Sequence, residues 1–289
     1  MEIRKNIFIS FSGGRTSAYM CKYMLDNHGD KNLLFLFANT GQEHPKTYEF
    51  IKNVVDHLGV DLKIVEAKIG HEKGTGTTYS EVTFDDMHKG GRLFEESVQR
   101  FGVFNMGYPA CTRELKLQPM KKFANDYFKG EKYTTVIGIR SDEIDRVNSK
   151  YEELDFYYPL AFDHPISKAQ VNDFWKKQPF DLEIPDYLGN CVWCWKKTAK
   201  KHQAIIRDYP EAFDVPKFLE KKYRVNNIES QARFGETQTF FRGHLSALDL
   251  FDENKIKKAM TFDFINNYEN SCEESCVPDF SEHDGESPV

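Results

Sequence analysis

Short apolar runs alternate with amphipathic stretches along the first half of the chain. Four runs predict buried strands, at residues 6–12, 32–38, 61–66 and 134–139. Between the first three, residues 16–26 and 45–58 have the apolar spacing of helices, and Pro45 suits a first helical turn. Strands that alternate with helices predict βαβ units, so we expect an α/β fold: an open parallel sheet with helices on both faces.

The rest of the chain is expected to be mainly helical. Helices are predicted at 119–128 and 167–177, and the pattern stays helical beyond Trp195. The segment 67–86 is rich in Gly and Thr and is interpreted as a mobile loop. We therefore predict three regions: an α/β nucleotide-binding domain at 1–190, a mainly helical C-terminal region at 191–268, and an acidic, disordered tail at 269–289.

Length and charge narrow the class of protein. A chain of 289 residues suggests one large domain or two small ones. Its net charge of −6 comes from the tail, and the rest is close to neutral, which neither demands nor excludes a nucleic-acid partner. The longest apolar run, residues 33–38, is far shorter than the roughly twenty residues of a membrane span. With no signal-peptide pattern at the N-terminus, we expect a cytoplasmic protein without a membrane partner.

The cysteines give the first indication of chemistry. Two of the six, Cys191 and Cys194, form a Cys-x-x-Cys pair, which in a reducing compartment is more often a metal or redox site than a disulfide. Cys21 falls on the first predicted helix and is expected to be buried. Cys272 and Cys276 lie in the acidic tail, where neighbouring carboxylates disfavour a reactive thiolate, although a mobile sulfur relay is an alternative.

A glycine-containing loop joins the first strand to the first helix. Its sequence, Ser12-Gly13-Gly14-Arg15-Thr16-Ser17, lets backbone N–H groups approach an anion, and a helix N-terminus adds partial positive charge. No Gly-Lys-Ser/Thr follows, so the loop is not a Walker A motif. It is either a phosphate site at the carboxyl end of a strand or a tight turn that needs glycine.

The loop resembles the SGGxDS pyrophosphate loop of the PP-loop ATP pyrophosphatases, and the closest branch resembles the phosphoadenosine phosphosulfate reductase family. Four further segments agree in order. They are Ala38-Asn39-Thr40-Gly41-Gln42-Glu43 (the family's DTG segment), Cys111 to Met120 (CCxxRKVxPL), Gly138 to Arg146 (GIRxDExxxR), and Tyr158-Pro159-Leu160 followed by Gly189 to Cys194 (YPL…GCxxC). The resemblance implies a PP-loop, HUP-like fold that binds ATP with Mg²⁺.

The resemblance also implies functional residues. The nucleotide would contact Ser12, Gly13, Gly14, Arg15, Thr16, Ser17, Phe37, Asn39, Thr40 and Gly138. Lys116, Arg140 and Arg146 would act in catalysis, since guanidinium and ammonium groups stabilise phosphate charge; surface ion pairing with Asp142 or Glu143 is the alternative for the arginines. Thr16 stands where the family usually has Asp. The intact Gly13-Gly14 pair favours ATP over an adenylyl sulfate.

Three cysteines match the family's cluster ligands: Cys111, Cys191 and Cys194, with Thr112 in place of a fourth. They would hold a [4Fe–4S] cluster with one open iron. One alternative is structural zinc with His202 as the fourth ligand, and another is two thiols packed beside Trp193 and Trp195 without metal.

These features predict an enzyme that adenylates its substrate, releases pyrophosphate and transfers sulfur through the cluster. The substrate could be a tRNA or DNA, with a sulfur-donor protein as a second partner. The basic run 196–202 could dock a nucleic-acid backbone, and the adjacent Trp193 and Trp195 could stack a base. The alternative is that this run is only a solvated helix face. The alternatives are a sulfonucleotide reductase and a non-catalytic adenine nucleotide-binding module.

Overall fold

The computed structural model describes residues 3–72, 75–105, 108–223 and 239–265. In these residues six strands form one sheet in the order β4-β3-β2-β1-β5-β6. The strands are β1 (Asn6–Ser10), β2 (Asn32–Asn39), β3 (Leu62–Lys68), β4 (Thr78–Val82), β5 (Thr134–Val136) and β6 (Phe156–Tyr157). Every pairing is parallel except that of β3 with β4. The predicted α/β fold is therefore confirmed, and the expected tail at 269–289 lies outside the described residues.

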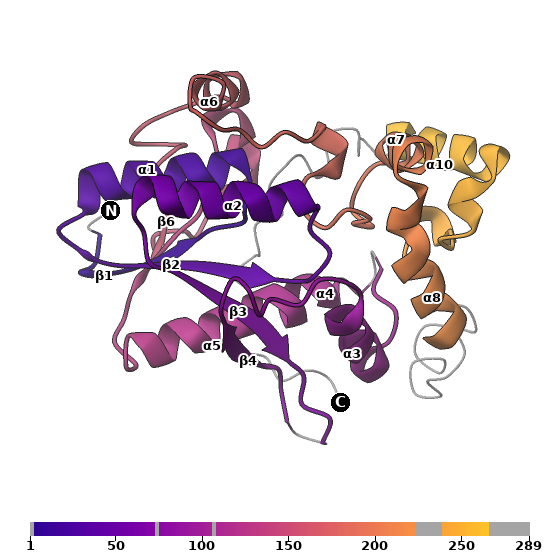
Figure 1. Ribbon diagram of the computed structural model, residues 1–289, viewed down its shortest axis with the longest axis horizontal. Helices are drawn as coiled ribbons and strands as arrows, with labels where there is room; N and C mark the ends of the chain where they lie inside the picture. Colours follow the sequence, from indigo (N-terminus) through magenta and orange to yellow (C-terminus); the bar gives the residue numbers. More distant parts are fainter. Residues whose placement is uncertain (1–2, 73–74, 106–107, 224–238, 266–289) are drawn as a thin grey trace.

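Helices cover both faces of the sheet (Figure 1). One face carries α1 (Arg15–His28), α2 (Pro45–Leu58) and α6 (Lys168–Trp175), and the other carries α5 (Gln118–Tyr127). Two separate apolar clusters fill these layers: Ile7 and Ile9 of β1 point to the α1 and α2 side, whereas Phe8 points to the α5 side. Because alternate residues of a strand face opposite ways, a continuous apolar run such as β1 is what a sheet covered on both faces requires.

Local signals set the bounds of α2, which runs over the predicted residues. The His44 ring accepts a hydrogen bond from the N–H of Lys46 at 3.2 Å, Pro45 occupies the first turn, and Gly59 ends the helix in the left-handed conformation. In the same way Ser167 and Gln170 form a reciprocal capping box at the start of α6. Caps therefore fix both ends of α2 and the start of α6.

The prediction of a loop at residues 67–86 is wrong in part. β3 continues to Lys68, and Thr78–Val82 then forms β4, an antiparallel edge strand. The side chains of β4 are exposed or half-buried, so the segment lacks the apolar alternation that would have indicated a strand. Its backbone pairing with β3 supplies the stability that its side chains do not.

The C-terminal region is helical, as predicted. Beyond β6 the chain forms η3 (Asp186–Leu188), α7 (Ala199–Asp208), η4 (Pro210–Phe213), α8 (Asp214–Tyr223), η5 (Arg242–His244), η6 (Asp249–Phe251) and α10 (Glu253–Ile265). The helices α7, α8 and α10 stand beyond the carboxyl ends of β2 and β3 (Figure 1). The apolar cluster on the α1 and α2 face continues into this region through Trp193, Phe213 and Phe240.

The segment between β4 and β5 completes the described helices. It contains α3 (Arg92–Phe101), α4 (Ala110–Thr112), the π-helix η1 (Arg113–Leu117) and then α5, while the 3₁₀ helix η2 (Ser141–Arg146) follows β5. No helix in the described ranges combines the length and the apolar character that crossing a membrane requires.

Candidate active site

The Ser12–Ser17 loop lies between β1 and α1 and is held by its own hydrogen bonds. Ser12 donates its backbone N–H and its hydroxyl to Oγ of Ser17, at 3.2 and 2.9 Å, and that hydroxyl donates to the carbonyl of Gly14 at 3.0 Å. Gly13 has φ of +80°, in the left-handed region, and its missing Cβ would point at Ile51 of α2. The two serines therefore shape the loop, and Gly13 allows it to pass close to α2.

The helix that follows the loop begins with bare N–H groups. Gly14 is the N-cap of α1 and has no side chain to accept from them, and no acidic residue lies in the first turn. Such a helix end carries partial positive charge and suits an anion. A cavity of about 10 Å³ lies over the loop, between the Ser12-Gly13-Gly14 backbone and the segment from Leu182 to Asn190. The loop thus has a backbone suited to an anion, the cavity as it stands admits about one water molecule, and the role of the loop toward phosphate stays a prediction.

Arg140 lies beneath this helix end. It follows β5 and is only 1% exposed, and its Nη1 donates to Oγ1 of Thr16 at 2.9 Å. Its Nε contacts Oδ1 of Asp142 at 2.9 Å, and Nη1 lies 3.2 Å from Oε2 of Glu143. The guanidinium therefore braces the first turn of α1 through Thr16, while the two carboxylates offset its charge. The ion pairs with Asp142 and Glu143, weighed as an alternative for the arginines, are present.

The two other predicted arginines point elsewhere. Arg15 binds both carboxylate oxygens of Asp181, at 2.7 and 3.1 Å, and also the carbonyl of Leu182, so it ties α1 to the segment that covers the loop. Arg146 pairs with Glu143 and is about one third exposed. Gly138 packs near the backbone of Ser17, where an added Cβ would lie 3.5 Å from its Cα.

At the end of β2, a buried polar network includes two of the predicted nucleotide-contacting residues, Asn39 and Thr40. Asn39 is fully buried; its amide donates to Oε1 of Glu66 at 2.6 Å, and its Oδ1 accepts from the hydroxyl of Tyr48 at 2.9 Å. Thr40 donates to Oε1 of Glu43 at 2.7 Å. The ring of Phe37 packs in the core near Phe11, with centroids 6.5 Å apart. The side chains of Phe37 and Asn39 thus hold the β2 edge in shape, and their roles toward a nucleotide stay predictions.

The three predicted cysteines line one cavity. Cys111, Cys191 and Cys194 meet there with Lys116, Thr112 and Thr40, and the cavity measures about 30 Å³. The indole of Trp195 donates to Sγ of Cys111 at 3.3 Å. Residues from three distant parts of the chain therefore converge at the carboxyl end of β2, as the resemblance implied.

A π-helix presents Lys116 to this cavity. In η1 the N–H of Gln118 donates to the carbonyl of Arg113, five residues back, which defines the wider turn. The next residue, Pro119, has no N–H to donate to the carbonyl of Leu115, so regular α-helical bonding is interrupted there. As a result Cys111, Leu115 and Lys116 all line the cavity. Wider turns of this kind occur often at functional sites.

The Cys-x-x-Cys segment is hydrogen-bonded to the residues that follow β2. Cys191 forms an antiparallel bridge with Glu43, the N–H of Val192 donates to the carbonyl of Gln42 at 2.8 Å, and the indole of Trp193 donates to Oε1 of Gln42 at 2.5 Å. Burial raises the pKa of the Cys191 thiol well above its ordinary value, and Cys194 and Glu43 add to the rise against Lys197 and Lys116. The thiol form is therefore favoured until a cation takes its place.

Three details of the predicted cysteine region are wrong. Trp193 and Trp195 are buried, so neither ring is available to stack a base. Lys197 is also buried and donates to the carbonyl of Val192 at 2.8 Å, so the basic run is not a uniformly solvated face. His202 contacts the backbone carbonyl of Cys194 at 3.0 Å and does not line the cavity. Burial lowers the pKa of this imidazole to about 3, so it is neutral.

The donor chemistry of the cavity suits a thiophilic metal, but its present spacing does not. Three thiols together are the ligand set of zinc or iron–sulfur centres. Within the described ranges, however, no three His, Cys, Asp or Glu side chains stand close enough to hold an ion as they are. A volume of about 30 Å³ admits a couple of water molecules, so a four-iron cluster would require the thiols to separate.

Cys21, by contrast, is buried in α1 as predicted, and burial raises the pKa of its thiol. The described cysteines Cys21, Cys111, Cys191 and Cys194 form no disulfide.

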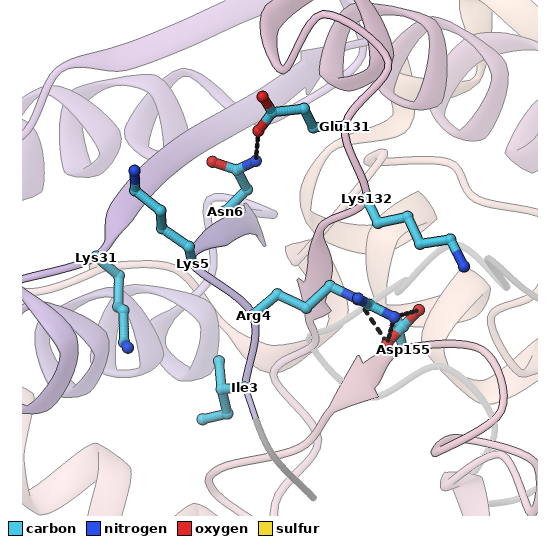
Figure 2. Close-up of a pocket in the computed structure, with 8 residues that line it drawn as sticks. All are labelled: Ile3, Arg4, Lys5, Asn6, Lys31, Glu131, Lys132 and Asp155. Atoms are coloured by element: carbon cyan, nitrogen blue, oxygen red, sulfur yellow. Dashed lines mark hydrogen bonds and ion pairs between the residues drawn. The ribbon is translucent and has the colours of Figure 1, made fainter.

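A larger hollow, of about 700 Å³, lies at the amino ends of the strands, opposite to the loop and the cysteine cavity (Figure 2). It is lined near the amino ends of the strands, where Arg4 binds Asp155 and Asn6 donates to Glu131. The lysines shown there extend in different directions and do not converge on one point (Figure 2). None of the predicted site residues lines it. Ligands of open α/β sheets bind at the carboxyl ends of strands, so size alone does not make this hollow the site.

Sequence reasoning missed one residue of the site, Asn190. It lines both the loop cavity and the cysteine cavity, and its φ of +59° is left-handed. Its place between Gly189 and Cys191 was the available signal, because Asn and Gly are the residues that most readily adopt this conformation.

Comparisons with known proteins identify one matching family model and several relatives. The family model of the phosphoadenosine phosphosulfate reductase domain matches residues 6–176. The chain is 32% identical, over 93% of its length and 93% of the relative's, to the uncharacterized nin region protein ORF290 of Escherichia phage lambda. It is 26% identical over 67% of its length to an uncharacterized protein of Methanocaldococcus jannaschii, of which it covers 32%.

Among solved structures, the NH3-dependent NAD synthetase of Campylobacter jejuni matches with a TM-score of 0.37 and 11% identity, covering 91% of this chain and 86% of that one.

Proposed function

Because this chain belongs to the phosphoadenosine phosphosulfate reductase domain family, we propose that it is an ATP-dependent enzyme which adenylates a substrate and releases pyrophosphate. We further propose that sulfur transfer at the three-cysteine cavity follows. One observation carries the proposal: the anion-binding loop and the cysteine cavity share Asn190 at the carboxyl edge of one sheet.

The loop supports ATP as the ligand. Its helix N-terminus presents partial positive charge to a pyrophosphate group. The buried guanidinium of Arg140 holds this helix end in place through Thr16, while Asp142 and Glu143 offset its charge. Thr16 replaces the family's Asp and its hydroxyl already accepts from Arg140, so the loop offers no carboxylate to a metal. Mg²⁺ would therefore be held mainly by the phosphate oxygens that carry it in.

The first step is a displacement at the α-phosphorus. An oxygen of the substrate attacks, the bond from the α-phosphorus to the bridging oxygen of the β-phosphate breaks, and pyrophosphate leaves. The loop N–H groups and Lys116 stabilise the charge that develops, so catalysis consists of positioning and electrostatics. In the second step a sulfide-level nucleophile, delivered by a sulfur-donor protein, forms a carbon–sulfur bond as the carbon–oxygen bond to AMP breaks.

Cys111, Cys191 and Cys194 are the residues that would hold a [4Fe–4S] cluster or a zinc ion. Once the thiols had separated, a cluster held by these three cysteines would supply an iron site able to bind the transferred sulfur. Trp195 and the lysines of the cavity would then face the bound group and offset its charge. A tRNA or DNA base is a substrate compatible with this chemistry.

Release of pyrophosphate from ATP tests the proposal. The purified chain is incubated with ATP, Mg²⁺ and candidate tRNA or DNA acceptors, and pyrophosphate and AMP are measured. Turnover that depends on the acceptor supports adenylation. Binding of ATP without pyrophosphate release would instead identify a nucleotide-binding module.

The family description favours one second candidate, reduction of an adenylyl sulfate. The same preparation is therefore given phosphoadenosine phosphosulfate with a dithiol reductant. Sulfite release together with no reaction of ATP would select the reductase. The loop that retains both Gly13 and Gly14 supports the opposite result.

A further inference from the structure

Asn190 is placed between the two cavities of the site. On one side it lines the loop cavity with Ser12, Gly13 and Gly14, and on the other it lines the cysteine cavity with Cys191 and Cys194. In the described part of the chain, no other residue lines both. Asn190 is therefore part of the wall of both cavities, and occupancy of one cavity can act on the other through it.

The backbone of Asn190 is strained for a residue with a side chain. Its φ of +59° is in the left-handed region, where the Cβ of an L-residue crowds the backbone and glycine would not. Asn tolerates the conformation better than most residues, but the turn itself needs no amide. Strained residues of this kind concentrate where a side chain has a functional task.

The amide is also buried. Asn190 is 8% exposed, and its primary amide offers two N–H donors and one carbonyl acceptor. Its neighbour Cys191 is bridged to Glu43, so the backbone of Asn190 is held beside the Cys-x-x-Cys segment. A nucleotide that extends from the loop toward the end of β2 passes this amide.

We propose that Asn190 contacts the phosphoryl group of the nucleotide held at the Ser12–Ser17 loop and couples nucleotide binding to the cysteine cavity. Its N–H donors face the phosphoryl oxygens, and its fixed link to Cys191 transmits binding to the thiols. The inference rests on the proposed nucleotide site. It predicts that bound ATP changes the reactivity of Cys111, the half-buried thiol of the cavity, and that this effect requires the amide.

The test uses the full chain as purified anaerobically, with iodoacetamide as the thiol probe. Asn190→Gly removes the amide and keeps the left-handed turn, and Asn190→Asp keeps the shape but places a carboxylate toward the phosphate. Lys129→Gly is the matched control, because Lys129 is exposed and also left-handed, with φ of +54°. Thermal unfolding checks that each variant is folded, and calorimetry measures its affinity for ATP.

In the parent chain and in Lys129→Gly, saturating ATP should slow alkylation of Cys111 by about tenfold, because coupled sites shift each other's equilibria. Asn190→Gly should bind ATP about tenfold more weakly and Asn190→Asp more weakly still. At saturating ATP, Asn190→Gly should lose the protection.

Equal protection in Asn190→Gly, or an Asn190→Asp variant that binds ATP like the parent, overturns the inference. If ATP binds the parent but leaves Cys111 alkylation unchanged, the coupling is absent while the proposed function stands. If the parent does not bind ATP at all, the proposed function fails and this inference fails with it.

Discussion

Gly13 offers a direct test of how the loop is built. An alanine Cβ there would lie 2.9 Å from Cδ1 of Ile51 and 3.2 Å from Cγ2 of Thr47. The reasoning from sequence was that a side chain at Gly13 blocks an anion from reaching the backbone. In the structure the added methyl group instead contacts Ile51 and Thr47 of α2, so we expect Gly13→Ala to weaken anion binding by displacing the loop.

The expected loss of stability follows from two contributions. Holding alanine at φ of +80° costs about 1 kcal/mol. Overpacking against Ile51 adds about 1–3 kcal/mol, so Gly13→Ala should lower the free energy of unfolding by about 2–4 kcal/mol. Gly130→Ala is the matched control: φ there is +77° and nothing lies within 4 Å of the added Cβ. It should cost only about 1 kcal/mol.

Urea unfolding of both variants measures these differences, with constant m-values as the condition for comparing them. Calorimetry should show ATP affinity reduced by about tenfold in Gly13→Ala, because the loop amides have moved. Adding Ile51→Val removes the atom nearest to the new methyl group and should recover part of both losses. Equal destabilisation in the two glycine variants would refute the packing argument, and a failure of Ile51→Val to restore any ATP affinity would return the cause to direct blocking.

Two further outcomes are expected. Each of the variants Cys111→Ser, Cys191→Ser and Cys194→Ser should abolish bound iron or zinc in anaerobic protein, whereas Cys21→Ser should not. Metal and sulfide analysis and the visible spectrum measure the loss. Metal retained in all three cavity variants would exclude this site. Burial alone would raise the pKa of Asp142, but the N–H of Lys168 and the guanidinium of Arg140 lower it below its ordinary value of 3.8. The stabilisation from these contacts is therefore complete above pH 3.8 and is lost as the pH falls below it. Asp142→Asn should accordingly flatten the acid side of the unfolding free-energy profile, and an unchanged slope would show that the carboxylate contributes nothing.

The sequence predicted those parts of the fold that local signals determine. The helix at 45–58 has its observed bounds because His44, Pro45 and Gly59 act within a turn of its ends. The strand β4 was missed because its side chains are not buried in a regular pattern and its pairing with β3 is tertiary. Edge strands of this kind depend on a partner that no local pattern shows.

The sequence predicted which residues belong to the site, but not all of the contacts that their side chains make. The convergence of Cys111 with Cys191 and Cys194 followed from the resemblance and is present. The sequence offered Asp142 and Glu143 as partners of Arg140, and both ion pairs are present. The contacts of Arg140 with Thr16 and of Arg15 with Asp181 were not predictable, because these partners lie more than a hundred residues away along the chain. These roles are set by packing, and the sequence shows the residues without showing the partners.

The C-terminal helices belong to the site because they support one wall of the cysteine cavity. Arg242 pairs with Asp263 of α10 at 3.3 Å and donates to the carbonyl of Lys196 at 2.5 Å. Asp263 in turn accepts from the N–H of Ala199, the first residue of α7, at 2.6 Å. A buried ion pair such as this adds little net stability, but it favours one arrangement of the segments that it joins. That arrangement fixes the chain immediately after Cys194, while Gln42 fixes it immediately before. The spacing of the thiols is thus set from both sides, by the sheet edge and by the C-terminal helices, and any group bound there is held by the two regions together.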